Sequence, residues 1–229
     1  MASEEKHLEE IKQAVIDGDS HASAQVTSDA VTDGVDPLII LNDGLMAGAD
    51  VVGQRFEAGE YFLPELMLAG RALKAAMAVV EPLLQAKYSS GEADKGDTGV
   101  VVMATVQTDI HDIGKNIVAS MLTATGFEVT DLGVDVPLKS IITKAQEIDA
   151  NIIGCSALLT TSMPFMRDLI DLLDAMGERE RFKVMVGGAS VTPEFAEKIG
   201  ADGTAPNAVD AVKLAKRLIR QQREAKGVS

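Results

Sequence analysis

The sequence has one cysteine, no tryptophan and few aromatic residues of any kind. Aromatic residues make up 3% of its 229 residues, and Cys155 is the only cysteine. One cysteine excludes an intrachain disulfide and a thiolate metal cluster. We expect Cys155, which falls inside a predicted buried strand, to be a small core residue. The shortage of aromatics favours cores built from smaller aliphatic side chains.

Long apolar runs are also missing. No stretch is long enough to span a bilayer, and the first residues lack the pattern of a signal peptide. These absences favour a cytoplasmic protein that does not bind membranes.

Basic residues are scarce in the first half of the chain. The net charge is −14, of which residues 1–97 carry −11 and the remainder −3. A negative surface repels phosphate backbones, so we expect no nucleic-acid binding by this half. The charge is interpreted mainly as a solvated surface, and a docking face for protein partners is the alternative.

The first ninety residues have the apolar spacing of helices. Asp36 and Pro37 give an N-cap followed by proline at the first helical position. Behind them, apolar residues recur at intervals of three and four, namely Leu38, Leu41, Leu45, Ala49, Val52 and Phe56. Another helix is expected before this one, over residues 20–34, with Ala22, Val26 and Ala30 on one face. The last helix of this half is expected to begin at Pro64, and Pro82 should disturb its end. Four helices with short links predict a helical bundle domain over residues 1–88.

A polar linker is expected at residues 89–97, and strands then alternate with helices over residues 98–229. The β-branched run from Gly99 to Val106 is typical of a buried parallel strand. Further strands are predicted at Glu128–Leu132, Asn151–Cys155, Lys183–Val186 and near Gly203, with a helix after each. This pattern predicts an α/β fold with a five-stranded, doubly wound parallel sheet, which is a Rossmann-like domain.

Three short motifs fall where predicted strands end. Asp109-Ile110-His111-Asp112-Ile113-Gly114 follows the first strand, Ser156-Ala157-Leu158 the third, and Gly187-Gly188 the fourth. Ligands of doubly wound sheets bind outside the carboxyl ends of the strands. We therefore expect all three motifs to meet at one edge of the sheet.

The residue types in these motifs suit a large cofactor that contains a metal. His111 can ligate a metal, and Asp109 is placed to accept its second N–H. Gly114 allows close approach to the helix start. Ser156, Thr160 and Ser162 offer hydroxyls to a ligand or to Asp109. Gly187 and Gly188 leave room for a long group, which a small divalent ion would not need.

Plainer interpretations exist for each motif alone. A histidine in a loop is most often a surface residue, and Asp109 could simply cap the helix. Paired glycines after a strand often form a turn or a phosphate site. An ordinary dinucleotide-binding domain is disfavoured because no Gly-x-Gly-x-x-Gly follows the first strand. The matching positions at three strand ends favour the cofactor site.

At these residues the chain resembles cobalamin-binding corrinoid proteins of the methyltransferase type. The family's Asp-x-His-x-x-Gly, Ser-x-Leu and Gly-Gly elements are matched in order, and the similarity extends through residues 131–137, 200–203 and 62–66. It is strongest to the corrinoid proteins of methylamine, betaine and O-demethylase systems, and the chain is similar to the cobalamin module of methionine synthase.

The resemblance implies how a corrinoid would be held. Cobalamin would bind base-off and His-on, with its benzimidazole tail along the groove by Ser156 and Gly187 and with His111 on cobalt. Ser162 would bond Asp109, so that Asp109, His111 and Ser162 form the catalytic relay. The cofactor contacts implied are Asp109, Ile110, His111, Asp112, Ile113, Gly114, Ser156, Leu158, Thr160, Ser162, Gly187 and Gly188. Met67 in the helical cap is a candidate for the upper face, although methionine at helical spacing is usually core.

The resemblance also implies a function and partners. A substrate-specific methyltransferase would load a methyl group onto cobalt(I), and a second methyltransferase would pass it to a thiol or tetrahydrofolate-type acceptor. A reductive activase is a further expected partner. The protein is then a carrier subunit of a methyltransferase system. The alternatives are a cobalamin-responsive regulator, which would need a DNA-reading module, and the small subunit of a carbon-skeleton mutase, which would lack the helical cap.

Overall fold

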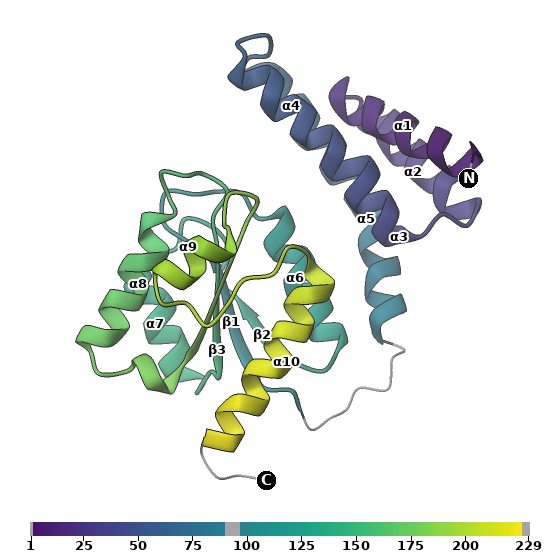
Figure 1. Ribbon diagram of the computed structural model, residues 1–229. Coiled ribbons are helices and arrows are strands. Elements are labelled where there is room, and N and C mark those ends of the chain that lie inside the picture. Colours follow the sequence, from purple (N-terminus) through teal and green to yellow (C-terminus); the bar gives the residue numbers. More distant parts are fainter. Residues whose placement is uncertain (1, 90–96, 226–229) are drawn as a thin grey trace. The chain divides into compact units, whose positions relative to one another are not determined.

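The computed structural model describes residues 2–89 and 97–225 of the chain (Figure 1). It divides into two compact units, Met1–Lys87 and Tyr88–Ser229. Of the predicted linker, residues 90–96 lie outside the described residues. No helix in the described ranges combines the length and apolar character needed to cross a membrane.

The first unit is helical. Its elements are α1 (Ala2–Ile16), α2 (Ser20–Thr32), α3 (Pro37–Ile39), the π-helical segment η1 (Ile40–Met46), α4 (Ala47–Glu57) and α5 (Leu63–Ser89). The predicted cap is confirmed, because the Asp36 carboxylate accepts the backbone N–H of Leu38 at 2.9 Å. α3, η1 and α4 follow one another without a break. Leu41, Leu45 and Val52 are buried as predicted, whereas Phe56 is exposed.

Two details of the helical unit differ from prediction. On α2 the buried residues are Ser23, Thr27 and Ala30, so the face that packs inward is rotated from the one predicted. Helix α5 also continues through Pro82 as far as Ser89. Proline removes one helical hydrogen bond, but Val80 and Leu84 on either side are buried, and their packing keeps the helix intact.

The second unit is an α/β domain with a parallel sheet. Its strands are β1 (Val100–Thr105), β2 (Glu128–Asp131), β3 (Ile152–Ser156) and β4 (Lys183–Gly187), in the order β2-β1-β3-β4. The helices are α6 (Ile113–Ala124), α7 (Leu138–Glu147), α8 (Pro164–Ala175), the short 3₁₀ segment η3 (Arg179–Arg181), α9 (Pro193–Lys198) and α10 (Ala208–Ala225). The predicted α/β class with a helical N-terminal part and a parallel sheet is confirmed.

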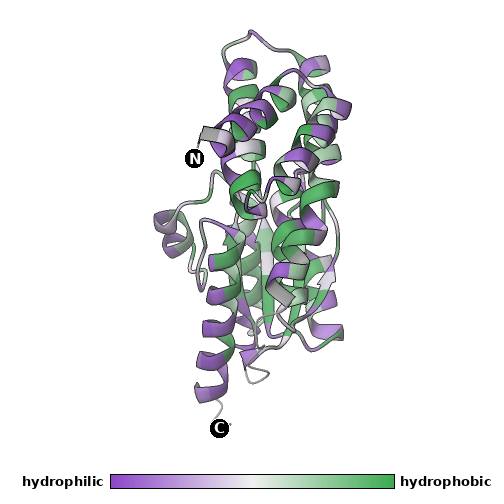
Figure 2. Cartoon of the chain, turned by 90° about the vertical axis from the view of Figure 1, so that its right-hand side faces the viewer, coloured by the Kyte–Doolittle hydropathy of each residue, from purple (hydrophilic) through white to green (hydrophobic). Residues whose placement is uncertain are grey.

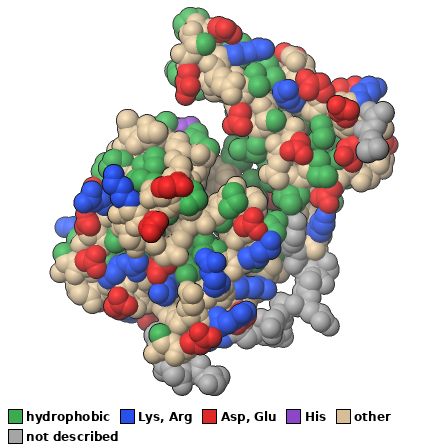
Figure 3. Space-filling model, viewed as in Figure 1, with side chains coloured by type: hydrophobic (Ala, Val, Ile, Leu, Met, Phe, Trp, Pro, Cys, Tyr) green, Lys and Arg blue, Asp and Glu red, His purple; other side chains and the backbone are tan. Residues whose placement is uncertain are grey.

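Helices cover both faces of this sheet (Figure 1). Successive side chains of a strand point to opposite faces of a sheet. Val102 and Ala104 of β1 pack in the core with α7, α8 and α9, whereas α6 and α10 lie on the opposite face. Seen from the side, α10 is hydrophobic toward the sheet and hydrophilic outward (Figure 2). Lysine and arginine side chains gather over this helix (Figure 3).

The fifth strand predicted near Gly203 is reduced to a single bridge. Within the described residues the sheet has four strands, and Gly203 pairs with Met185 alone. The Asp202 carboxylate accepts the backbone N–H of Val184 at 2.7 Å. The Asp202 side chain therefore accepts a backbone N–H of β4 that a carbonyl of a longer fifth strand would otherwise accept.

Candidate functional site

The loops that follow β1, β2 and β3 meet at the carboxyl edge of the sheet. The loop after β1 holds Asp109 and His111. Its Asp109 carbonyl accepts the N–H of Asp135, in the loop after β2, at 2.9 Å. The Asp109 side chain contacts the backbone of the segment after β3. Parallel strands end at the same edge, so residues distant in sequence share one site, as the spacing predicted.

Asp109 is fully buried, and both of its carboxylate oxygens are used. Oδ1 lies 2.7 Å from Nδ1 of His111 and accepts the His111 backbone N–H at 3.1 Å. Oδ2 accepts the backbone N–H groups of Leu158 at 2.8 Å and Leu159 at 3.0 Å. One oxygen thus faces the histidine and the other is fixed to the neighbouring loop.

These hydrogen bonds decide the charge state of Asp109. Burial raises the pKa of its carboxyl, but the N–H of Leu159, the His111 side chain and the N–H groups of His111 and Leu158 together outweigh burial and hold the pKa below its ordinary value. The ionised carboxylate only accepts hydrogen bonds, so the ring proton of neutral His111 is assigned to Nδ1. The lone pair of Nε2 is then free to bind a metal.

The imidazole of His111 is accessible. Its side chain is 47% exposed, and the hydroxyl of Thr105 donates to the His111 carbonyl at 3.0 Å, which holds the backbone of the loop. Large apolar side chains are exposed at the ends of the same strands, namely Ile110, Val134, Leu158 and Leu159. Such side chains around one accessible nitrogen suit a broad, apolar ligand.

A bare metal ion would find too few ligands here. No group of three or more His, Cys, Asp or Glu side chains among the described residues is arranged to hold a metal. His111 can therefore supply one ligand to a metal that already carries others, as the metal of a macrocycle does. Cys155 offers no thiolate, because it is buried and burial raises its pKa to about 12.

Ser162 differs from the expectation in its partner. It is fully buried, but its Oγ lies 3.0 Å from Oγ1 of Thr108, while the Asp109 oxygens are occupied by His111 and the backbone. The expected bond from Ser162 to Asp109 is therefore replaced by a contact one residue earlier. The N–H donors of Leu158 and Leu159 bind Oδ2, the oxygen of Asp109 that does not face His111.

The two glycines after β4 have different reasons to be glycine. A Cβ on Gly188, whose φ is +132°, would lie 1.9 Å from the carbonyl oxygen of Ala157. A Cβ on Gly187 would meet nothing within 4 Å, and the same is true of Gly114. Gly188 is thus required by the close approach of two backbones, whereas Gly187 and Gly114 border open space.

The other predicted contacts are spread along the same edge. Asp112 and Ile113 begin α6, Ser156 ends β3 partly buried, and Thr160 is exposed in the segment that follows. Met67 belongs to the helical unit, where its side chain is 53% exposed and is not a core residue.

Sequence reasoning missed four residues of this edge. Thr108 and Asp135 fix the loop, and Val134 and Leu159 add apolar surface. Val134 and Asp135 lie in the stretch of residues 131–137, which carried the resemblance but suggested no role for any one side chain. Leu159 also binds Asp109 through its backbone N–H, and a main-chain role of this kind cannot be recognised from the type of residue.

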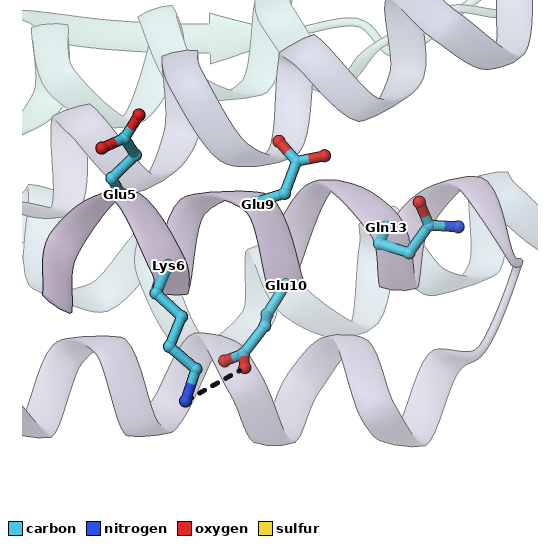
Figure 4. Close-up of a pocket in the computed structure, with 5 residues that line it drawn as sticks. All are labelled: Glu5, Lys6, Glu9, Glu10 and Gln13. Carbon is cyan, nitrogen blue, oxygen red and sulfur yellow. Dashed lines mark ion pairs between the residues drawn. The ribbon is translucent and has the colours of Figure 1, made fainter. Parts of the chain in front are cut away.

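A hollow lies on the surface of the helical unit. Figure 4 shows it along one helix, lined by Glu5, Lys6, Glu9, Glu10 and Gln13 of α1. Among the five lining side chains, Lys6 pairs with Glu10 at 3.6 Å, and Glu9 pairs with Lys12 beside them at 3.4 Å. These solvated side chains are typical of a helix surface, and none of the predicted site residues lines the hollow.

Comparison with known proteins agrees with this geometry. Two family models, each described as a B12 binding domain, match residues 99–213 and 7–81. The chain is 45% identical over 219 residues to dimethylamine corrinoid protein 1 of Methanosarcina mazei, covering 96% of this chain and 99% of that one.

Solved structures are similar as well. The monomethylamine corrinoid protein of Methanosarcina barkeri matches with a TM-score of 0.84 and 35% identity, over 93% of this chain and 99% of that one. A chain of the methanol:cobalamin methyltransferase complex of the same organism matches with a TM-score of 0.51 and 30% identity, over 94% and 80%.

Proposed function

This chain belongs to the B12-binding corrinoid proteins, and from that premise we propose that it carries methyl groups between two methyltransferases. The observation that carries the proposal is the pair formed by Asp109 and His111. A buried, ionised carboxylate holds the proton of an accessible imidazole on Nδ1, which leaves Nε2 as a single metal ligand.

The residues at the sheet edge fit a corrinoid bound base-off and His-on. Nε2 of His111 would bind the cobalt, and the exposed side chains of Ile110, Leu158 and Leu159 would contact the apolar ring. The open space beside Gly187 would admit the displaced benzimidazole tail. When bound, the corrinoid supplies a cobalt centre that can accept and release a methyl group.

The protein's own contribution is to adjust how strongly the imidazole donates. A hydrogen bond to a carboxylate raises the basicity of a ligating histidine and fixes its orientation. Oδ1 of Asp109 makes this bond, while Oδ2 remains held by two backbone N–H groups. The apolar side chains around His111 would exclude water from its Nε2 once a ligand covers them.

The helical unit is proposed as the cover of the cofactor. Five large apolar side chains are exposed where α4 ends and α5 begins, namely Phe56, Phe62, Leu63, Met67 and Leu68. A group of exposed apolar side chains of this size usually marks a surface that binds a ligand or another protein. These side chains would shield the methyl group from water, and Met67 is the candidate predicted from the sequence.

The expected partners are a substrate-specific methyltransferase, an acceptor methyltransferase and a reductive activase. The similarity to a dimethylamine corrinoid protein and to a methyltransferase complex supports the first kind of partner. A methylamine is the class of methyl donor favoured by the dimethylamine and monomethylamine corrinoid proteins among these relatives.

The proposal is tested by loading the purified protein with hydroxocobalamin. We expect one cobalamin per chain and a visible spectrum that changes in His111→Ala, because the axial nitrogen is lost. The surface histidine variant His21→Ala is the matched control and should leave the spectrum unchanged. The proposal fails if wild-type protein binds no stoichiometric cobalamin, or if His111→Ala has the wild-type spectrum.

A further inference from the structure

Thr108 holds a backbone conformation that β-branched residues rarely adopt. Its φ is +70°, in the left-handed region, and it directly precedes Asp109. A β-branched side chain is strained there, and such strain persists only where surrounding contacts impose it. The contacts around Thr108 must therefore impose this conformation on it.

Two neighbouring loops hold this residue. Its backbone N–H donates to the Asp135 carboxylate at 2.7 Å, and its Oγ1 lies 3.0 Å from Oγ of Ser162. Asp135 also donates its own N–H to the Asp109 carbonyl at 2.9 Å. Thr108 and Asp109 are thus tied on one side to the loop after β2 and on the other to the segment after β3.

The contact with Ser162 is the part that depends on the threonine side chain. The bond to Asp135 uses the main-chain N–H, which every residue except proline provides. Ser162 is fully buried, so its hydroxyl has no access to solvent. Thr108 itself is exposed, so the pair of hydroxyls is a part-buried link between Thr108 and the segment whose N–H groups bind Asp109.

We infer that Thr108 is a positioning residue, which acts through Ser162 to set the orientation of the Asp109–His111 pair. The inference rests on the proposed function, since it concerns how well His111 is presented as a ligand. It assigns Ser162 an indirect role in which the hydroxyl reaches the loop through Thr108. Neither residue touches a reacting atom.

The first test uses the protein without cofactor. Amide hydrogen exchange measured by NMR reports the N–H groups of Leu158 and Leu159, which Asp109 accepts. We expect exchange at both to be about tenfold faster or more in Thr108→Val and Ser162→Ala, because the loop opens more readily. Thr108→Ser keeps the hydroxyl and should restore wild-type rates.

Further variants separate the hydroxyl from other effects. Thr108→Gly accepts a positive φ without strain, so it removes the hydroxyl while relieving the backbone, and it should still show faster exchange. Thr123→Val is the matched control, since its hydroxyl bonds only within α6, to the Ala119 carbonyl. The double variant of Thr108→Val with Ser162→Ala should be no worse than either single variant, because both break one contact.

The second test uses the protein loaded with hydroxocobalamin. The spectra of Thr108→Val and Ser162→Ala should lie between those of wild type and His111→Ala, and Thr108→Ser should match wild type. Wild-type exchange rates and spectra in both Thr108→Val and Thr108→Gly would overturn the inference. Failure of wild-type protein to bind cobalamin would instead overturn the proposed function, and the exchange test would still decide whether Thr108 positions the pair.

Discussion

Oδ1 of Asp109 lies 2.7 Å from Nδ1 of His111, and this contact joins a buried anion to an accessible ring. A carboxylate in this position acts as the second partner of a metal-ligating histidine, because it fixes the tautomer and increases the basicity of the free nitrogen. The carboxylate is itself fixed by the N–H groups of Leu158 and Leu159. The orientation of the His111 ring is therefore set by residues from two loops.

Asp109→Asn should weaken cobalamin binding by about 10- to 100-fold, which is the usual loss when such a partner is changed. A carboxamide has one accepting oxygen, so it cannot serve both His111 and the two backbone donors. We also expect a loss of about 1–3 kcal/mol in the free energy of unfolding, because buried N–H groups lose their acceptor. Equilibrium dialysis and urea unfolding measure the two effects. Asp168→Asn on the exposed side of α8 is the control, and equal affinities of the two variants would contradict the prediction.

The contribution of Asp109 to stability should depend on pH in one direction. Its pKa is lowered in the folded protein, chiefly by hydrogen bonds that outweigh burial. Unfolded aspartate titrates near about 3.9, so the stabilisation is complete above that pH and is lost as the pH falls through the lower folded value. The difference in unfolding free energy between wild type and Asp109→Asn should be constant from pH 7 to 5 and shrink below about pH 4. A difference that grows on acidification would refute this.

The two glycines after β4 should respond differently to alanine. Gly188→Ala places a Cβ 1.9 Å from a backbone oxygen at a φ of +132°, so we expect a loss of more than about 2 kcal/mol in unfolding free energy. Gly187→Ala enters open space and should change stability by less than about 1 kcal/mol. Cobalamin affinity should nevertheless fall in Gly187→Ala, since the methyl group occupies the proposed path of the tail. Unchanged affinity there would show that the tail lies elsewhere.

Lys115→Met should destabilise the α/β unit. The Lys115 ammonium is buried at the start of α6 and pairs with Asp131 at the end of β2, and it also donates to Asn116 at 2.7 Å. Removing the charge leaves Asp131 unpaired, but that carboxylate is one-third exposed and partly hydrated. We expect a loss of about 1–3 kcal/mol in the urea unfolding free energy. Lys139→Met on the exposed face of α7 is the control, and equal losses in both variants would argue against the pair.

Much of the α/β unit could be predicted because its signals are local and periodic. The β-branched run of β1 indicated a buried parallel strand, and the motifs after β1, β3 and β4 had to reach one edge once the strands were parallel. The pairing of Asp109 with His111 was also predictable, because the two residues share one short loop.

The remaining features depend on contacts that cannot be recognised from the types of the residues involved. The fifth strand is lost because the Asp202 side chain takes a backbone donor of β4. Ser162 contacts Thr108 instead of Asp109, whose carboxylate oxygens are bound by His111 and by backbone N–H groups. The inward face of α2 buries Ser23 and Thr27, two small polar residues that a search for apolar periodicity passes over.

The two carboxylate oxygens of Asp109 bind different partners, and this separation matters for repeated turnover. If the imidazole of His111 moves away from Oδ1, the two bonds at Oδ2 remain, and the carboxylate keeps its place. In the proposed corrinoid complex, the ring could therefore leave the cobalt and return to the same position without any reordering of the loops. Each such release would break one hydrogen bond, at a net cost of only about 1 kcal/mol, so the proposed ligand could be restored to its position after each turnover.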